Sequence, residues 1–388
     1  MDRTCMSTRP DLRPTWAEID LDAFAANVEA IAHSLPSGSR LIAVLKADGY
    51  GHGALELAKR CSPQHVVMIA TSLLEEALEL RDGGVELPLL VLGPLTAMQI
   101  PMAVDAGIRI GVIGPEELAM VCQLASDRDV SIDLKLDSGM GRMGIVESEL
   151  GAVIEMLKAS PRVKVEAAYT HYASADDDEA FTTAQSAKFD EMLVALRAGG
   201  ISPALHHMAN SAATLRGLVR SGDHVRCGIA LFGAESVIDG RRRTQPVMRW
   251  RTEIARLKEL PAGAAVGYGT TFHTARPSRI ATLPVGYADG YDRRLSNRAQ
   301  VLVRGRRLPL VGRVSMDLLT IDVTDLPDAA VGDEVILLGS QGGESITAEE
   351  LATLAGTISY EIFCRVSARV PRLYLDVRGP RLTSRFTP

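Results

Sequence analysis

The chain has 388 residues, 46% hydrophobic and 23% charged, so it can bury a large core and we expect two globular domains. Its formal net charge of -6 gives no basic footprint for nucleic acid or for anionic lipid. A small molecule is therefore the expected partner.

The cysteines and the first residues indicate the compartment. The five cysteines are odd in number and lack CxxC spacing, which argues against a disulfide framework and against a zinc cluster. Residues 1–15 contain no apolar signal core, and no later run reaches membrane-spanning length. We expect a loose N-terminus, a cytoplasmic location and no membrane contact.

Short apolar runs alternate with segments of helical period through the first two thirds of the chain. The expected strands are 41–46, 66–70, 88–92, 108–113, 131–137, 163–170, 204–208 and 224–231. A further helix is expected over 21–35. Eight strands, each followed by a helix, predict a (β/α)8 TIM barrel, whose reactive groups gather at the carboxyl ends of the strands.

The pattern changes after the arginines at 241–243, which we interpret as a solvated linker. Short strands separated by glycine and proline turns follow, with one helix over 348–354. We therefore expect a flexible segment over 1–15, the barrel over 16–245 and a mainly β domain over 246–388.

Lys46 ends the first expected strand and enters a glycine-rich segment over 47–53. A lysine in such a place loses hydration, which favours its neutral amine and lets it form a Schiff base with an aldehyde. This position favours chemistry rather than a role in solubility.

Charged residues alternate with leucines in the fifth expected strand, so Lys135 and Asp137 share the face that a barrel turns toward its lumen. Arg142 follows in a glycine-rich loop, where a guanidinium can bind a carboxylate with two hydrogen bonds. The alternative is a structural ion-pair network beneath a glycine turn.

Two further strand ends carry groups suited to an anion. Asn210 and Ser211 precede a short helix, where they either cap it or bind phosphate together with its free N–H groups. Gly228 and Ile229 belong to the eighth expected strand, where a glycine lets a ligand approach the backbone, and barrels often hold phosphate near strands seven and eight. The histidines lack the spacing of metal ligands, so we expect no metal.

Four of the eight tyrosines cluster in or near glycine turns of the β domain: Tyr268, Tyr287, Tyr291 and Tyr360. Each is compatible with an ordinary strand position, since tyrosine favours strands. The flanking glycines instead suggest close backbone approach or sharp turns.

An ordered set of motifs resembles the alanine racemase family, whose members use pyridoxal 5'-phosphate (PLP) on a fold-type III scaffold. The motifs are AVLKADGYGHG at 43–53, GMGRMG at 139–144, THYA at 170–173, HMANS at 207–211, RCGIALFG at 226–233, VGYG at 266–269, VGYADG at 285–290 and GRVSMD at 312–317. Together they span nearly the whole chain.

The resemblance implies a role for each matching residue. Lys46 would hold PLP, Arg226 would face its pyridine nitrogen, and Lys46 and Tyr268 would be the two catalytic bases. The remaining cofactor residues would be Tyr50, His171, His207, Asn210, Ser211, Gly228, Ile229 and Tyr360. The substrate residues would be Arg142, Met316, Tyr287 and Asp317, with Lys135 a possible carbamate that orients Arg142.

The predicted function is the interconversion of L- and D-alanine, which supplies D-alanine for peptidoglycan, by a homodimer with shared active sites. The alternatives are a racemase that also accepts serine, a PLP-dependent decarboxylase with a similar barrel, and a non-catalytic PLP-binding protein. A decarboxylase is expected to present an acidic partner to the pyridine nitrogen, whereas this chain presents Arg226. A module that only binds PLP has no need of Tyr268.

Overall fold

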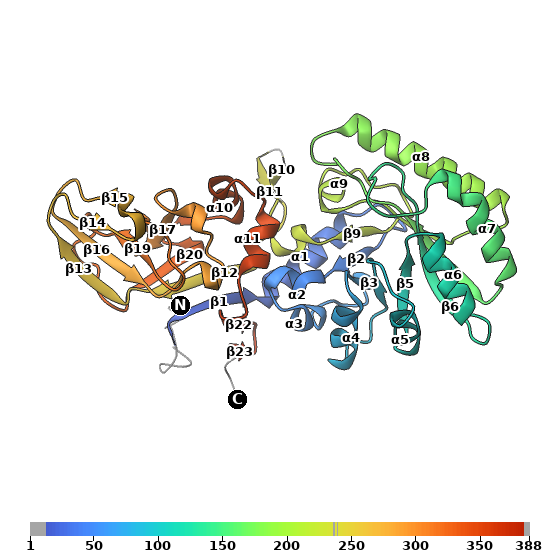
Figure 1. Ribbon diagram of the computed structural model, residues 1–388, viewed down its shortest axis with the longest axis horizontal. Coiled ribbons are helices and arrows are strands. Elements are labelled where there is room, and N and C mark those ends of the chain that lie inside the picture. The colour runs from blue at the N-terminus through green and yellow to red at the C-terminus, as the bar shows by residue number, and fades with distance from the viewer. Residues whose placement is uncertain (1–12, 236, 239, 384–388) are drawn as a thin grey trace. The chain divides into compact units, whose positions relative to one another are not determined.

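The computed structural model describes residues 13–235, 237–238 and 240–383, which fall into two compact units (Figure 1). The barrel unit contains residues 24–49 and 53–244. The β unit contains the other described residues, 13–23, 50–52 and 245–383. The loose N-terminus expected from the sequence falls mostly on residues 1–12, which lie outside the described residues.

Eight parallel strands form the sheet of the barrel unit, in the order β8-β7-β6-β5-β4-β3-β2-β9. They are β2 (Leu41–Val44), β3 (Val66–Thr71), β4 (Leu89–Val91), β5 (Ile108–Val112), β6 (Val130–Lys135), β7 (Val163–Tyr169), β8 (Leu205–His207) and β9 (Val225–Cys227). The two ends of this order meet, because His207 and His224 form a parallel bridge and the Arg226 N–H donates to the Ala209 carbonyl over 2.8 Å. The predicted barrel is confirmed.

Helices α4 to α8 lie outside these strands (Figure 1). The helices are α1 (Leu21–Ser34), α2 (Lys46–Gly51), α3 (Ala54–Ala58), α4 (Leu74–Asp82), α5 (Gln99–Asp105), α6 (Pro115–Leu124), α7 (Leu150–Ala159), α8 (Glu179–Ala198) and α9 (Ser211–Leu215). In α7 the buried residues are Leu150, Val153, Ile154 and Leu157, the spacing that places one apolar stripe on a core. A short hairpin of β10 (Val237–Ile238) and β11 (Arg241–Arg242) follows the barrel.

The barrel strands carry buried polar residues as well as apolar ones. All four residues of β2 are buried, as expected for a parallel strand covered on both faces. Buried charged or polar side chains from other strands include Asp133, Lys135, His207 and Arg226. A layer of polar groups therefore replaces part of the usual aliphatic filling of the lumen.

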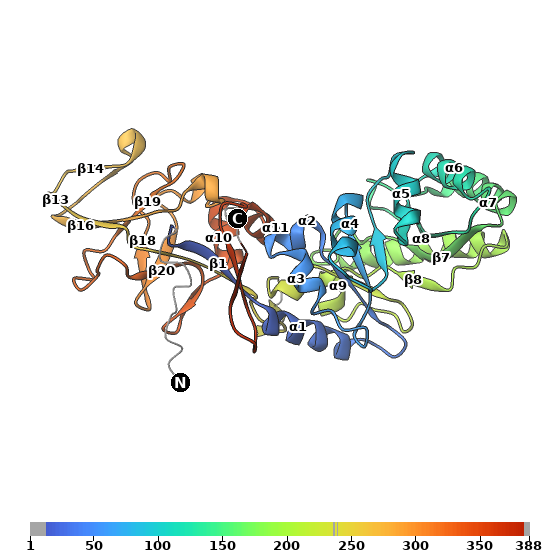
Figure 2. The ribbon, with the colours of Figure 1, turned by 90° about the horizontal axis from the view of Figure 1, so that it is seen from below.

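The β unit contains one large sheet, in the order β18-β17-β20-β12-β1-β22-β23 with β21 paired to β20, and the smaller sheets β13-β16-β19 and β14-β15. The elements are β1 (Thr15–Asp20), β12 (Met248–Glu253), β13 (Arg256–Leu260), β14 (Ala265–Val266), β15 (Phe272–His273), β16 (Ser278–Leu283), β17 (Gln300–Val303), β18 (Arg306–Pro309), β19 (Leu319–Asp322), β20 (Glu334–Gln341), β21 (Glu344–Ile346), α10 (Ala348–Ala355), α11 (Ser359–Arg365), β22 (Arg372–Leu375) and β23 (Arg381–Thr383). Figure 2 shows β13 and β16 at one end of this unit and α10 and α11 at the other.

Strand β1 differs from the expected organisation, which grouped residue 16 onward with the barrel. Thr15 pairs antiparallel with Thr252 of β12, and Ala17 pairs parallel with Arg372 of β22. The strand is thus part of the main sheet of the β unit. These partners lie more than 200 positions away in the sequence, so no local pattern indicates them. Helix α11, which carries Tyr360, was also not expected.

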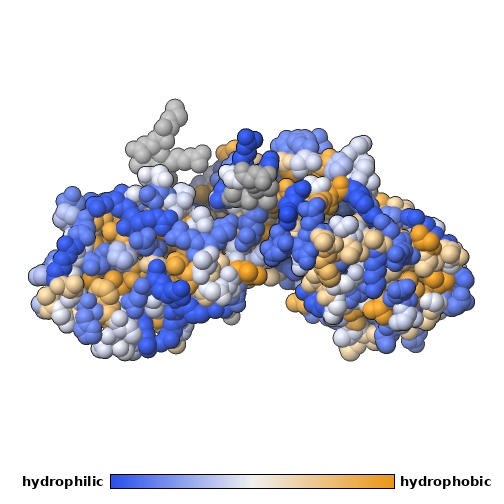
Figure 3. Space-filling view, turned by 90° about the horizontal axis from the view of Figure 1, so that it is seen from above, coloured by the Kyte–Doolittle hydropathy of each residue, from blue (hydrophilic) through white to orange (hydrophobic). Residues whose placement is uncertain are grey.

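The face shown in Figure 3 is largely hydrophilic, with scattered hydrophobic patches. Among the described residues, no helix combines the length and the apolar character needed to cross a bilayer.

Candidate active site

Lys46 lies just beyond the carboxyl end of β2, at the first residue of α2. The backbone on both sides of it is fixed by hydrogen bonds. The Leu45 N–H donates to the Ala70 carbonyl over 2.9 Å, and the Ala47 N–H donates to Oε1 of Glu76 over 2.7 Å. The half-buried Lys46 side chain therefore starts from a rigid point at the mouth of the barrel.

Helix α2 is a left-handed turn, because φ is positive at every residue from Ala47 to Gly51. Ala47, Asp48 and Tyr50 have φ of 53°, 52° and 55°, values that cost about 1–2 kcal/mol for each side chain with a Cβ. The Asp48 carboxylate accepts the Ala54 N–H over 2.8 Å, which holds the end of the turn. The glycine-rich segment is thus a defined, strained turn.

Lys135 is buried inside the barrel near other cations. Burial, followed by the charges of Arg142 and Arg226, lowers the pKa of its amine to about 8. Among the described residues no carboxylate forms an ion pair with Lys135. Asp137 instead accepts the Gly139 N–H over 3.0 Å and the Gly141 N–H over 2.9 Å, so it holds the loop that carries Arg142. The alternative of a Lys135–Asp137 ion pair is therefore not what the structure shows.

Arg226 is buried beneath the strand ends and donates only to neutral groups among the described contacts. Its guanidinium reaches Nδ1 of His207 at 2.7 Å, Nδ1 of His171 at 3.0 Å and the Thr170 carbonyl at 2.6 Å. Burial lowers the pKa of Arg226 to about 10, that of His207 to about 4 and, with the added charge of Arg226, that of His171 to about 3. Both imidazoles are therefore neutral near pH 7, and Arg226 keeps its charge.

The second ring nitrogen of His207, Nε2, faces residues that were not predicted from the sequence. Nε2 of His207 lies 3.1 Å from Oδ2 of Asp133, whose Oδ1 lies 3.2 Å from Arg109. The Tyr169 ring stacks on the His207 ring at 4.7 Å, and the Arg226 guanidinium lies 5.2 Å from the Tyr169 ring centre. Asp133 shares the alternating face of Lys135 and Asp137, which is the signal that could have found it.

Ser211 and the turn after β9 form a small anion cradle. The Ser211 hydroxyl accepts the Gly228 N–H over 3.1 Å and the Ala230 N–H over 3.4 Å. Within the described part of the chain, the buried Ile229 N–H between them makes no hydrogen bond. Asn210 caps α9 by accepting the Ala213 N–H over 3.0 Å, as the capping alternative expected.

The candidate residues of the β unit lie largely on its surface. Tyr268 is 72% exposed, Met316 52%, Tyr287 42% and Tyr360 37%. The ring of Tyr360 lies 5.9 Å from that of Tyr50, which is buried in the same unit.

Tyr287 and Met316 are held together by backbone hydrogen bonds of 3.0 Å, from Tyr287 N–H to the Ser315 carbonyl and from Ala288 N–H to the Met316 carbonyl. A Cβ on Gly286 would lie 2.3 Å from that Ser315 oxygen, so this approach requires glycine. The neighbouring Asp317 carboxylate pairs with Arg369 at 2.7 Å.

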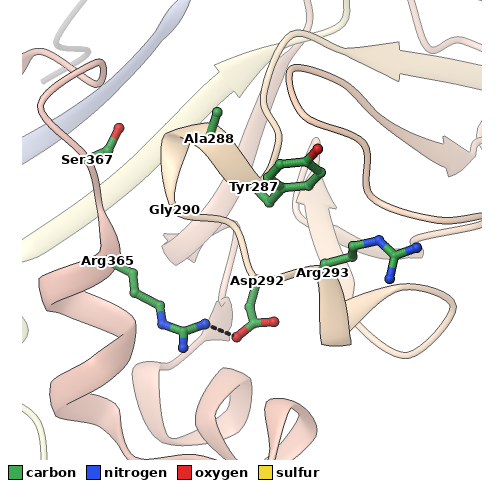
Figure 4. Close-up of a pocket in the computed structure, with 7 residues that line it drawn as sticks. All are labelled: Tyr287, Ala288, Gly290, Asp292, Arg293, Arg365 and Ser367. Atoms are coloured by element: carbon green, nitrogen blue, oxygen red, sulfur yellow. Dashed lines mark hydrogen bonds and ion pairs between the residues drawn. The ribbon is translucent and has the colours of Figure 1, made fainter.

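A cavity of about 480 Å³ lies beside Tyr287 in the β unit (Figure 4). Its lining consists of Tyr287, Ala288, Gly290, Asp292, Arg293, Arg365 and Ser367. Figure 4 shows Arg365 paired with Asp292, while the Arg293 side chain points away from that pair. Tyr287 is the predicted site residue that lines this cavity.

Two family descriptions match the chain. "Alanine racemase, N-terminal domain" matches residues 19–236, and "Alanine racemase, C-terminal domain" matches residues 247–374. Alanine racemase from Symbiobacterium thermophilum is 43% identical over 369 residues, which cover 94% of this chain and 97% of that protein. Alanine racemase from Halothermothrix orenii is 42% identical over 373 residues, covering 95% of this chain and 98% of that one.

Solved structures agree. Alanine racemase from Bacillus anthracis with bound L-Ala-P has a TM-score of 0.90 and 36% identity, covering 97% of this chain and 99% of that one. Alanine racemase from Clostridium difficile has the same TM-score at 32% identity, covering 98% and 100%. The fold and these matches define an isomerase. The chain belongs to the alanine racemase family, as its motifs predicted.

Proposed function

We propose that this chain interconverts L- and D-alanine with PLP bound in the barrel unit. The observation that carries the proposal is a cluster of cations at the strand ends. Lys46, Arg142 and Arg226 each lower the pKa of both Lys135 and His171. Such a concentration of positive charge suits a ligand with a phosphate and a substrate with a carboxylate.

The residues present fit PLP. The Ser211 hydroxyl, which accepts the Gly228 N–H, can donate its own proton to a phosphate, and the Ile229 N–H, without a partner among the described residues, is a second donor that such an anion would satisfy. Lys46 supplies the amine for the aldehyde, and Arg226 supplies a cation for the pyridine nitrogen. Bound there, PLP supplies an electron sink that acidifies the Cα–H bond of an amino acid joined to it.

The supporting cofactor residues follow the family resemblance. Tyr50 and Tyr360 would add hydroxyls at the phosphate. His171 and His207 would hold Arg226, which both already contact. Asn210 would act through its cap on the helix that begins at Ser211.

Racemisation needs a proton removed from one side of Cα and another delivered to the opposite side, so we assign two bases, Lys46 and Tyr268. A phenol near its reference pKa of about 10 is a weak base at neutral pH unless a neighbour stabilises its phenolate. His171 is suited to this, because its Nδ1 accepts from Arg226 and its remaining ring proton is on Nε2.

The substrate carboxylate would be bound by Arg142 and by the Met316 backbone N–H, which makes no hydrogen bond among the described residues. Lys135, converted to a carbamate, would supply a negative charge that orients Arg142. Tyr287 and Asp317 would border the approach to this position. Crowding by Tyr268, Tyr287, Tyr360 and Met316 would favour a small side chain such as that of alanine, although serine differs from it by only one hydroxyl group.

A second copy of the chain would complete each site, because Tyr268, Tyr287 and Met316 are largely exposed in a single chain. We therefore propose a head-to-tail homodimer with shared active sites. The proposal includes a cytoplasmic location, supported by the cysteine composition, and a supply of D-alanine for peptidoglycan, supported by the family alone.

Chiral analysis of products from L-alanine, D-alanine and L-serine tests the activity. Borohydride reduction, which fixes the cofactor to the amine that holds it, followed by peptide mapping tests the site. We expect each alanine enantiomer, given alone, to yield a mixture of both. We expect peptide mapping to find the reduced cofactor on Lys46. The Lys46→Ala variant should not be labelled. Its turnover rate should fall by about 100- to 10,000-fold.

The matched control is Lys59→Ala, which removes an exposed lysine paired with Glu56 at 2.8 Å in the same unit. It should keep the label and the activity. Label on another lysine, or racemisation that survives Lys46→Ala, would refute the proposed role of Lys46.

A further inference from the structure

We propose that Asp133 and Arg109 are positioning residues that hold His207 in one tautomer and, through it, fix Arg226 beneath the cofactor. This inference rests on the proposed function only where it concerns Arg226 and PLP. The tautomer itself is a property of the protein and is measurable whether or not the chain racemises alanine.

The four residues form a line of polar contacts through the barrel lumen. Arg226 contacts His207, His207 contacts Asp133, and Asp133 contacts Arg109, which is in β5. The side chains of Asp133 and His207 are 0% and 1% exposed, whereas that of Arg109 is 20% exposed. A carboxylate so deeply buried is costly unless its oxygens are hydrogen-bonded, and here both are.

The direction of every hydrogen bond in this line follows from the guanidinium. Arg226 has donors and no acceptor, so Nδ1 of His207 must present a lone pair to it at 2.7 Å. The single proton of the neutral imidazole is then on Nε2, where it donates to Asp133 over 3.1 Å. Asp133 is acceptor-only and takes its second hydrogen bond from Arg109.

The ring of His207 has little freedom to escape this arrangement. Tyr169 stacks on it with an angle of 10° between the planes, and the His207 carbonyl also accepts from Arg226. The contribution of Asp133 is therefore its negative charge and its role as a hydrogen-bond acceptor, rather than the space that its side chain fills. Its negative charge strengthens Nδ1 of His207 as an acceptor and partly balances Arg226 and Arg109.

Asp133→Asn tests this idea because it keeps the shape and removes the symmetry of the two oxygens. If the new NH2 group faces Arg109, two donors oppose each other. If it faces His207, Nε2 must become the acceptor and the proton moves to Nδ1, opposite the Arg226 donor. Because Arg109 has no acceptor to offer whereas the imidazole can move its proton, we expect the second orientation, which reverses the tautomer of His207.

The primary measurement is the pair of ring 15N shifts of His207 in the full-length protein labelled with 15N-histidine, assigned by the signal that His207→Gln loses. The wild type should show a proton on Nε2 alone. Asp133→Asn should lose that pattern, and kcat should fall by about 10- to 100-fold with KM changed by less than about threefold, the usual scale for outer partners of a functional histidine.

The double variant Arg109→Met/Asp133→Asn provides the sharpest comparison. Without Arg109 the new NH2 group can face the vacated side, so the remaining oxygen accepts from Nε2 of His207 again. We expect the wild-type 15N pattern to return and most of kcat with it. Asp190→Asn, which breaks an exposed pair with Arg220 at 2.6 Å, is the control and should change neither quantity.

Three outcomes would overturn the inference. They are a wild-type His207 protonated on Nδ1, a double variant no better than Asp133→Asn, and a reversed tautomer that leaves kcat unchanged. The wild-type measurement decides the first even if Asp133→Asn does not fold. An enzyme that racemises nothing but shows the expected shifts would refute the proposed function and keep the tautomer assignment.

Discussion

The candidate residues of the barrel unit and those of the β unit differ in how they are held. In the barrel unit, Arg226 and His207 are buried and His171 is half-buried; Arg226 contacts the two histidines at 2.7 and 3.0 Å, and burial lowers the pKa of all three. In the β unit, Tyr268 and Met316 present more than half of their surface to solvent.

This difference separates two tasks. Buried groups with fixed partners cost little reorganisation when a charged ligand arrives, which is the property required of a cofactor site. Exposed tyrosines and a methionine in a single chain instead indicate a surface completed by another molecule. The comparison therefore predicts that the barrel supplies the cofactor chemistry and that a second copy supplies the rest.

The largest test of this comparison is subunit complementation. Lys46→Ala and Tyr268→Phe should each lower kcat by about 100- to 10,000-fold, because each removes a proposed base. Mixed and exchanged, they should form hybrids in which one of the two sites is intact. Random pairing of the chains predicts recovery of about a quarter of wild-type activity.

The matched control mixes Lys46→Ala with Arg142→Ala. Both residues belong to the barrel unit, so every site of that hybrid lacks one of them and no recovery is expected. Equal behaviour of the two mixtures, once subunit exchange is verified by mass, would contradict sites shared between barrel and β unit.

The sequence predicted the barrel well because buried parallel strands are continuous apolar runs, and each expected run contains a strand. It did not predict β1 as part of the β sheet, because the ladders of Thr15 and Ala17 join distant residues. Glycines at 49, 51 and 53 marked the turn after Lys46, but the left-handed backbone of Ala47 and Asp48 has no local signal.

The same limit applies to the site. Lys46, Arg142 and Arg226 stand out by motif, whereas the roles of Asp133 and Arg109 become visible only once strands β5 to β8 are placed in one sheet. Motifs record residues that meet a ligand. The residues that hold those ligand-contacting residues in place are identified by their neighbours in three dimensions, which sequence spacing alone does not reveal.

The carbamate proposed on Lys135 gives a test with a smaller expected effect, in the barrel unit. With a pKa of about 8, its amine is about half neutral at pH 8, and only the neutral amine adds CO2 to form a carbamate. We expect a carbamate carbon signal after exchange with 13C-bicarbonate, lost in Lys135→Ala. As pH falls below 8, the amine regains its proton, the carbamate is lost and KM for alanine should rise.

Lys135→Ala should lower kcat/KM by about 10- to 100-fold, the worth of a hydrogen bond between charged groups. Lys158→Ala, an exposed lysine paired with Glu155 at 2.9 Å, is the control and should have no effect. An unlabelled protein with an unaltered pH dependence of KM would remove the support for the carbamate.

The smallest effect concerns the left-handed turn from which Lys46 projects. Ala47 is exposed with φ of 53°, whereas Ala152 is exposed within the right-handed helix α7. Glycine relieves about 1–2 kcal/mol of strain at the first position and costs about 1 kcal/mol at the second. The added freedom of the unfolded chain offsets about 0.4–1 kcal/mol of the relief at Ala47, and it is already included in the cost at Ala152.

Ala47→Gly should therefore leave the free energy of unfolding unchanged or raise it by up to about 1.6 kcal/mol, and Ala152→Gly should lower it by about 1 kcal/mol. Denaturant midpoints measured on the two variants in parallel decide the sign. Equal losses in both would mean that the turn is not held in the left-handed region in solution. A stable Ala47→Gly with a lowered kcat would show instead that the stiffness of the turn, and not its shape alone, keeps the Lys46 amine in place.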